Sequence, residues 1–283
     1  MPETLLTCPV CETLLTQSAN SLICENHHCF DYAKEGYINL LPPQHKKTKE
    51  PGDNKEMIRC RKDFLQAGYY QFLSPAIANV IKRFVTKEQN KNFLDSGCGE
   101  GYFTNQIKSL LDSSYTLYGM DISKEAVRLS AKRNNNIHWF VASSNNIPIQ
   151  DKSLDIVLKI NAPLNFEQLK NKLSENAIAI SVSPGKNHLA KLRETLYLKP
   201  QSHKQEATPD GFTLLDQSAA EAPLSIIGQT DINRLFKMTP YYWNASAAAK
   251  EKVAELQTLD TSASFNINVY QINKNISKTR EHE

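Results

Sequence analysis

The sequence predicts an α/β protein in which a small β-rich module precedes a larger domain built on a parallel sheet. Three observations support this prediction. Four of the six cysteines fall within the first 29 residues, a strand-like run ending at Leu94 breaks into three glycines at alternate positions, and strand-like and helix-like segments alternate after it. A length of 283 residues fits about two domains of roughly 150 residues each.

Composition and charge narrow the classes of function. An apolar content of 40% supports a real core, and no apolar run approaches the roughly 20 residues that span a bilayer. The first residues lack the basic and apolar stretches of a signal peptide, so we expect a soluble, cytoplasmic protein with no membrane partner. Residues 42–62 carry seven bases against three acids, a local excess that fits both nucleic-acid binding and a solvated linker.

The cysteine cluster predicts a structural zinc site. Cys8-Pro9-Val10-Cys11 places two thiols on one tight turn, and Cys24-Glu25-Asn26-His27-His28-Cys29 offers further soft ligands thirteen residues later. Such clustering in a reducing compartment indicates metal rather than disulfides, and a metal explains how so short a module folds. His28 and Cys29 are both reachable as the fourth ligand, with His27 as a third option.

A linker and two helices are expected next. Residues 42–52 are proline-rich, basic and without periodicity. Asp53 and Glu56 resemble a capping box that starts a helix ending at Gly68. Ser74-Pro75 is typical of the first residues of a second helix.

The run Asp95-Ser96-Gly97-Cys98-Gly99-Glu100-Gly101 predicts a cofactor loop between a strand and a helix. This geometry brings backbone N–H groups and a helix N-terminus against a ligand. A dinucleotide fingerprint would need its third glycine at Tyr102. The observed pattern instead resembles the S-adenosylmethionine loop of class I methyltransferases, which have a Rossmann-like fold, so Asp95, Gly97, Gly99 and Gly101 are expected to contact the cofactor.

The segments after the loop predict the rest of the sheet. Residues 115–120 read as a strand ending at Asp121, whose carboxylate is placed to bind a ribose, and Ser123 caps a helix to about Arg133. Further strands are expected at 137–142, in the second part of 151–160 after a turn, and at 176–182. Residues 264–270 alternate apolar and polar side chains, which fits an antiparallel edge strand closing the sheet.

Two loops at the same edge of the sheet are expected to meet ligands. Ser143 stands where class I methyltransferases often carry Asp, so Asn145 to Ile147 are the candidates for adenine contacts. Asn161-Ala162-Pro163 ends a strand where these enzymes commonly meet substrate. It lacks the Asn-Pro-Pro-aromatic motif of exocyclic-amine methylation. No residue stands out as a general base, and this strand end is where we expect one.

Several motifs together resemble one family. They are Cys8-x-x-Cys11, the run from Phe30 to Pro42, Gln44-His45-Lys46, Pro51-Gly52-Asp53, the glycine loop, Ala142-Ser143-Ser144, Pro184-Gly185, Met238-Thr239-Pro240 and Trp243. The chain closely resembles the bacterial 23S ribosomal RNA guanine-N1 methyltransferases from about Cys8 to Tyr270. The family includes an enteric housekeeping enzyme and relatives associated with tylosin resistance.

The resemblance implies a ligand set, a substrate and an assembly. Zinc would be held by Cys8, Cys11, Cys24 and His28. S-adenosylmethionine would contact Tyr70, Gly99, Glu100 and His188. The substrate would be a guanine in hairpin 35 of domain II of 23S rRNA, and the protein would be a homodimer.

We therefore expect four segments. Residues 1–41 form a zinc-binding RNA-recognition module, 42–56 a basic linker, 57–273 the methyltransferase domain and 274–283 a polar tail. Two other functions fit parts of the pattern. A small-molecule methyltransferase of quinone-biosynthesis type would share the glycine loop without needing the cysteines, and a non-catalytic ribosome-assembly protein could keep the whole fold.

Overall fold

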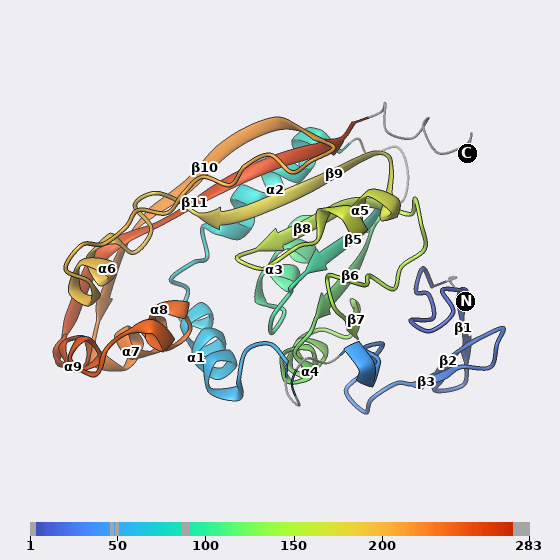
Figure 1. The fold of residues 1–283 in the computed structure, drawn as a ribbon, viewed down its shortest axis with the longest axis horizontal. Helices are drawn as coiled ribbons and strands as arrows, with labels where there is room; N and C mark the ends of the chain where they lie inside the picture. The colour runs from blue at the N-terminus through green and yellow to red at the C-terminus, as the bar shows by residue number, and fades with distance from the viewer. Residues whose placement is uncertain (1–3, 46–47, 49–50, 86–90, 274–283) are drawn as a thin grey trace.

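A mixed eight-stranded sheet forms the centre of the molecule in a computed structural model, which describes residues 4–45, 48, 51–85 and 91–273 (Figure 1). The strand order is β10-β11-β9-β8-β5-β6-β7-β4. Its strands are β4 (Ile38–Asn39), β5 (Lys91–Ser96), β6 (Tyr115–Asp121), β7 (His138–Val141), β8 (Leu154–Ile160), β9 (Leu173–Pro184), β10 (Phe212–Ile227) and β11 (Thr258–Ile272).

The parallel part of the sheet confirms the alternation read from the sequence. Strands β4 to β9 pair in parallel, whereas β11 runs antiparallel to β9 and β10 antiparallel to β11. The antiparallel direction expected for residues 264–270 is confirmed. Their expected place at the edge of the sheet is wrong, because β10 pairs with the outer side of β11 and is itself the edge strand. Strand β10 is largely exposed, polar and alanine-rich around Pro223, so it has no clear apolar alternation.

Nine helices pack on and beside this sheet within the described residues. They are α1 (Lys55–Gln66), α2 (Leu73–Phe84), α3 (Tyr102–Leu110), α4 (Lys124–Arg133), α5 (Phe166–Lys172), α6 (Ala190–Leu196), α7 (Gln229–Lys237), α8 (Pro240–Asn244) and α9 (Ala247–Glu255). None of the helices in these ranges combines the length and apolar character that a bilayer crossing requires.

The first residues of three helices can be compared with the capping residues expected from the sequence. Ser123 caps α4 as expected, accepting from the Ala126 N–H. The capping residue of α1 is Asn54 rather than Asp53, because the Asn54 side chain accepts from the Met57 N–H while Asp53 pairs with Arg61. Helix α2 begins one residue before Ser74 and has no side-chain cap.

The N-terminal module is joined to the main sheet. Its own antiparallel sheet consists of β1 (Leu15–Ser18), β2 (Ser21–Cys24) and β3 (Cys29–Asp31). The next strand, β4, pairs in parallel with β7, and Leu6 forms a bridge with Ile149. Buried residues of the module, including Leu15 and Leu22, share one apolar cluster with the main sheet. The module is therefore packed onto the sheet, although the segment boundaries themselves stay predictions.

Candidate active site and metal centre

A cavity of about 1770 Å³ opens at the C-terminal ends of the parallel strands. Small-molecule sites usually measure about 300–1,000 Å³, so this cavity has room for a cofactor and part of a second reactant. The glycine loop, Asp121, the residues after β8, His188 and part of α8 line it. These segments lie far apart in the sequence and meet at the edge where α/β sheets bind ligands.

The glycine loop is shaped so that two of its glycines cannot be replaced without collision. Gly97 has φ +79°, and a Cβ there would lie 2.3 Å from the Ala162 Cβ. Gly101 has φ +77°, and a Cβ there would lie 2.9 Å from both Ser130 and the Trp139 ring. A left-handed backbone favours glycine, and the close approach leaves no room for a Cβ at either position. Gly97 also shows that the loop lies directly against the residues that follow β8.

Asp121 is fixed by backbone donors at the end of β6. Its Oδ2 accepts from the Gly99 N–H at 3.0 Å, and its Oδ1 accepts from the Ser123 N–H at 2.8 Å. Burial raises the pKa of the Asp121 carboxyl, while these two N–H groups oppose that rise. Each oxygen keeps a second lone pair. The carboxylate lines the cavity where the sequence predicts a ribose contact.

Four buried polar groups of the cavity wall have no hydrogen-bond partner among the residues that the structure describes. They are the Tyr70 hydroxyl, Asp95 Oδ1, Ser96 Oγ and Ser183 Oγ. The other oxygen of Asp95 accepts from Thr104 at 2.6 Å, and burial raises the Asp95 pKa to about 7. Unpaired buried polar atoms are costly, and they fit a ligand rich in polar groups. The ammonium, carboxylate and ribose hydroxyls of S-adenosylmethionine supply such groups.

Glu100 and His188 both lie in the cavity wall with defined partners. The Glu100 carboxylate forms an ion pair with Arg133 on α4. The His188 Nδ1 accepts from the Ser264 N–H at 3.3 Å, and burial lowers the pKa of His188 to about 3. A neutral imidazole that accepts at Nδ1 carries its proton on Nε2. His188 therefore provides an N–H donor beside Tyr70, whose ring centroid lies 6.0 Å away.

The loops after β7 and β8 match the contacts expected from the sequence only in part. Asn161 adopts a left-handed backbone at φ 51°, a strained conformation that clusters at functional sites. Asn145 and Asn146 line the cavity as expected, whereas Ile147 is buried in the core and cannot contact adenine from there. Tyr241 and Trp243 also line the cavity.

Sequence reasoning missed a second polar group in the cavity. Lys159 on β8 forms an ion pair with Glu206 at 2.6 Å, and Ser181 on β9 donates to the same carboxylate. Glu206 lies in residues 197–211, which contain no helix or strand. A glutamate in a segment without periodicity carries no sequence signal, so only the fold could bring it to β8.

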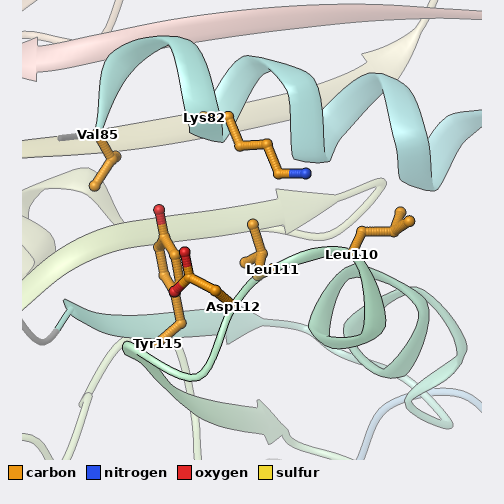
Figure 2. A pocket seen from close by; sticks show the side chains of 6 residues that line it. All are labelled: Lys82, Val85, Leu110, Leu111, Asp112 and Tyr115. Carbon is orange, nitrogen blue, oxygen red and sulfur yellow. The ribbon is translucent and has the colours of Figure 1, made fainter. Parts of the chain in front are cut away.

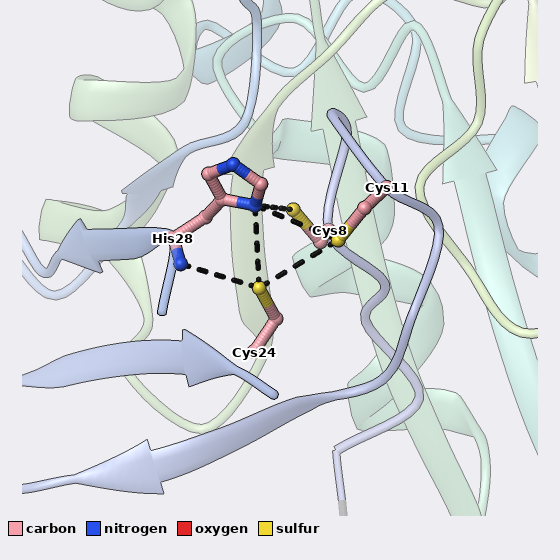
Figure 3. A group of neighbouring side chains, drawn as sticks. All are labelled: Cys8, Cys11, Cys24 and His28. Carbon is pink, nitrogen blue, oxygen red and sulfur yellow. Dashed lines mark hydrogen bonds between the residues drawn. The ribbon is translucent and has the colours of Figure 1, made fainter. Parts of the chain in front are cut away.

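Cys8, Cys11, Cys24 and His28 gather where the Cys8–Cys11 turn meets the turn between β2 and β3 (Figure 3). The His28 Nδ1 lies 3.5, 3.5 and 3.4 Å from the sulfurs of Cys8, Cys11 and Cys24 respectively, and the Cys11 and Cys24 sulfurs are 3.7 Å apart. Zinc bonds measure about 2.3 Å to sulfur and about 2.05 Å to nitrogen. A tetrahedral ion with such bonds requires nitrogen–sulfur distances of about 3.6 Å and sulfur–sulfur distances of about 3.8 Å between its ligands. This donor set therefore fits zinc.

Cys29 is placed outside that cluster. Its side chain is exposed, and its sulfur approaches the Asp31 carboxylate at 3.9 Å. The alternative that the sequence left open is thus separated from the other three thiols, and the four clustered donors include His28 instead.

A smaller pocket of about 300 Å³ lies elsewhere, between the end of α2 and the start of β6 (Figure 2). Val85, Leu110 and Leu111 form the aliphatic half of its wall, and Lys82, Asp112 and Tyr115 form the other half. It lies at the N-terminal end of the strands, away from the glycine loop, so it takes no part in the site described above.

Two family models match the chain. Residues 6–49 match the model described as RlmA, N-terminal, a zinc ribbon, and residues 93–183 match a methyltransferase domain. The chain is a methyltransferase with an N-terminal zinc ribbon. S-adenosylmethionine and structural zinc are its cofactors, as the cavity and the Cys/His cluster indicate.

Relatives that span nearly the whole chain confirm the resemblance to the guanine-N1 methyltransferases. One, from Bacillus subtilis, is named as a candidate 23S rRNA (guanine-N1)-methyltransferase and is 28% identical over 92% of this chain and 94% of its own length. The 23S rRNA (guanine(748)-N(1))-methyltransferase of Streptomyces fradiae is 28% identical over 89% and 90%. A phthiotriol/phenolphthiotriol dimycocerosates methyltransferase of Mycobacterium ulcerans matches only 30% of this chain.

Proposed function

We propose that the protein transfers a methyl group from S-adenosylmethionine to N1 of a guanine in 23S rRNA, in hairpin 35 of domain II. One observation carries the proposal: the relatives named for this reaction align with both the zinc ribbon and the methyltransferase domain, over about nine-tenths of the chain. The relative named for a lipid substrate aligns with less than a third of it. A small-molecule substrate would leave the zinc ribbon without a purpose.

The cavity residues would hold the cofactor by complementary chemistry. Bound S-adenosylmethionine supplies an activated methyl group on its sulfonium. Asp121 would accept from the ribose hydroxyls, and the unpaired Oδ1 of Asp95 and the Nε2–H of His188 would meet the charged groups of the methionine part. Because the Glu100 carboxylate is paired with Arg133, a ligand contact from Glu100 would come from its backbone. Tyr70 and the glycines at 97, 99 and 101 would complete the wall.

The base must be brought to this wall and held there. Guanine N1 is paired inside a helix, so the target must be unpaired or flipped out before it reacts. The protein contributes by placing N1 about 3–3.5 Å from the methyl carbon. Tyr241 and Trp243 line the cavity and offer faces on which an exposed base could stack.

The zinc module and the basic segment at residues 42–56 would bind the RNA hairpin. We place zinc on Cys8, Cys11, Cys24 and His28, where it would hold three short strands together. Of the basic segment, Lys46, Lys47 and Lys49 fall outside the described residues. A homodimer, as in the family, would enlarge the basic surface, and an rRNA substrate would place the reaction in the cytoplasm.

Mass mapping of 23S rRNA from cells with and without the gene tests the proposal. We expect one N1-methylguanine to disappear from hairpin 35 on deletion and to return with the wild-type gene. Complementation by an Asp121→Ala variant is the control, because it should leave the protein folded and the guanine unmethylated. An unchanged methylation map would reject the proposal.

A further inference from the structure

A row of polar side chains crosses three central strands next to the cofactor loop. Lys159 on β8 is in register with Ser181 on β9, and Ser181 is in register with Asn268 on β11. All three residues are buried, with exposures of 7%, 1% and 1%. Apolar side chains occupy most inward positions of this sheet, so a buried polar row there needs a specific partner.

Glu206 is the partner of two members of the row, Lys159 and Ser181, whereas Asn268 bonds Gln217 and the Tyr270 hydroxyl. One carboxylate oxygen pairs with the Lys159 ammonium at 2.6 Å, and the other accepts from Ser181. The Glu206 side chain is 33% exposed and lines the cavity. Its carboxylate is thus held in one orientation and still open to a ligand.

The segment that carries Glu206 is fastened at other points. His203 and the Tyr241 hydroxyl are joined by a 2.8 Å hydrogen bond, and the backbone carbonyl of Gln201 accepts from Arg193. Long segments without secondary structure inside a compact domain commonly serve binding sites. Here the segment places an acid over the ends of β8 and β9.

The position of Glu206 distinguishes it from the other carboxylates of the cavity. In the described part of the wall, Asp95, Glu100 and Asp121 belong to β5, the glycine loop and β6, and Asp53 pairs with Arg61 at 2.5 Å. Glu206 instead faces β8, and Ala162, two residues after the end of that strand, lies against the glycine loop. A base bound between the two sides would face the cofactor loop and Glu206 together.

We propose that Glu206 is a catalytic residue that reads the Watson–Crick edge of the target guanine and accepts its N1 proton. This inference rests on the proposed function. Guanine presents N1–H and N2–H side by side, and the two oxygens of one carboxylate match that pair of donors. As the N1–CH3 bond forms, the S–CH3 bond breaks with its electron pair left on sulfur, and the N1 proton passes to the Glu206 carboxylate. Lys159 and Ser181 are positioning residues, since they hold the acid without touching the base.

The test compares Glu206→Gln with Asp210→Asn in single-turnover methylation of a hairpin 35 RNA. Asp210 is a matched control, because it lies on the same segment with its side chain 99% exposed. We expect Glu206→Gln to lower the rate at least 100-fold, within the usual range for a lost general base, and Asp210→Asn to keep it. Cofactor affinity, measured by calorimetry, should be unchanged in both variants.

Two further readouts separate catalysis from a structural role. In Glu206→Gln the residual rate should rise with pH, because the guanine then has to lose its N1 proton to solvent. In wild type, replacing the target guanosine by inosine removes the N2 donor and should lower the rate about tenfold or more, whereas Glu206→Gln should be much less sensitive to this replacement.

The outcomes separate the two proposals. A Glu206→Gln rate within threefold of wild type, or a loss of cofactor affinity equal to the loss of rate, would overturn the role of Glu206 and leave the proposed function standing. A wild-type protein that methylates no guanine N1 would overturn both. A pH-independent residual rate would also reject the proton-transfer role.

Discussion

The zinc cluster and the cofactor cavity are two polar sites that the chain builds in opposite ways. In the cluster, three sulfurs and one nitrogen converge to within 4.8 Å and face one another. In the cavity, polar atoms such as Asp95 Oδ1 and Ser183 Oγ are buried without a partner in the described part of the chain, and they belong to β5 and β9, which β8 separates. We therefore expect the first site to depend on its ligand for its fold, and the second to be formed by the sheet before the ligand binds.

Removing a zinc ligand should give the largest effect on stability. We expect Cys24→Ser to lose its zinc and to unfold the region around β1–β3, because those strands are three or four residues long and structural zinc contributes about 10–16 kcal/mol in small zinc domains. Metal analysis and hydrogen exchange measure this effect. S-adenosylmethionine affinity should stay within a few-fold of wild type.

Cys29→Ser is the matched control for that experiment. Its sulfur lies outside the cluster, so the variant should keep one zinc ion per chain and normal exchange protection. Zinc retained by Cys24→Ser, or lost from Cys29→Ser, would show that the ligand set is different from the one we propose.

The second largest effect should come from the glycine loop. Gly97→Ala forces a left-handed alanine and a collision with Ala162, whereas Gly228→Ala at φ +98° meets nothing within 4 Å. We expect Gly228→Ala to cost about 1–2 kcal/mol of unfolding free energy and Gly97→Ala about 3 kcal/mol or more, with loss of cofactor binding. Urea unfolding and calorimetry measure both. Equal losses of unfolding free energy in the two variants would mean that the glycine loop shifts to accommodate the alanine Cβ.

Two buried groups of the cavity should give opposite pH dependences of stability. The pKa of His188 is lowered from 6.5 to about 3, so the unfolded chain binds the extra proton between these values and stability rises with pH there. The pKa of Asp95 is raised from 3.8 to about 7, so the folded chain binds the extra proton and stability falls with pH. The two effects offset each other between pH 3.8 and 6.5.

Single variants should separate these effects. In His188→Gln the unfolding free energy should fall as pH rises from 4 to 6.5, and in Asp95→Asn it should rise, with slopes of up to about 1.4 kcal/mol per pH unit. Denaturant titrations at three pH values measure both slopes. Identical pH profiles in the two variants would contradict the burial of these side chains.

The smallest effect on the fold should come from the basic segment between the two sites. Replacing Lys46, Lys47 and Lys49 together by Ala should leave both sites and the unfolding free energy unchanged. RNA affinity should fall, and the slope of log K against log salt should flatten by about two if all three contact phosphates. Binding measured from 50 to 200 mM salt tests this, and an unchanged slope would reject phosphate contacts by these lysines.

The sequence predicted most of what is local. The glycine loop, the strand ending at Asp121 and the Ser123 cap each depend on residues within one turn or one strand. A short stretch of sequence is therefore enough to predict them. Strand β10 was missed because its exposed face and alanine-rich middle remove the apolar alternation. Asn54 took the place of Asp53 at the start of α1 because an ion pair with Arg61 engages the aspartate.

Contacts between distant segments were beyond the sequence. Glu206 meets Lys159 across 47 residues, and no spacing rule joins a loop glutamate to a strand lysine. The choice of His28 over Cys29 depended on which way β3 runs after its turn, which the ligand spacing alone left open. His188 was expected near the cofactor only through the family resemblance, since a single histidine has no spacing pattern of its own.

The pairing of β4 with β7 has a consequence for how this chain can be cut. In the described part of the chain the short strand β4, Ile38 and Asn39, pairs along that side of the sheet, and the Leu40 N–H continues the pairing by donating to the Val141 carbonyl. A fragment beginning at residue 42 would expose the unpaired N–H and C=O groups of β7 together with buried side chains such as Phe140. Unpaired strand edges of this kind form backbone hydrogen bonds with strands of other chains. The amino-terminal module is thus also a protective border, and a catalytic fragment prepared without it should aggregate.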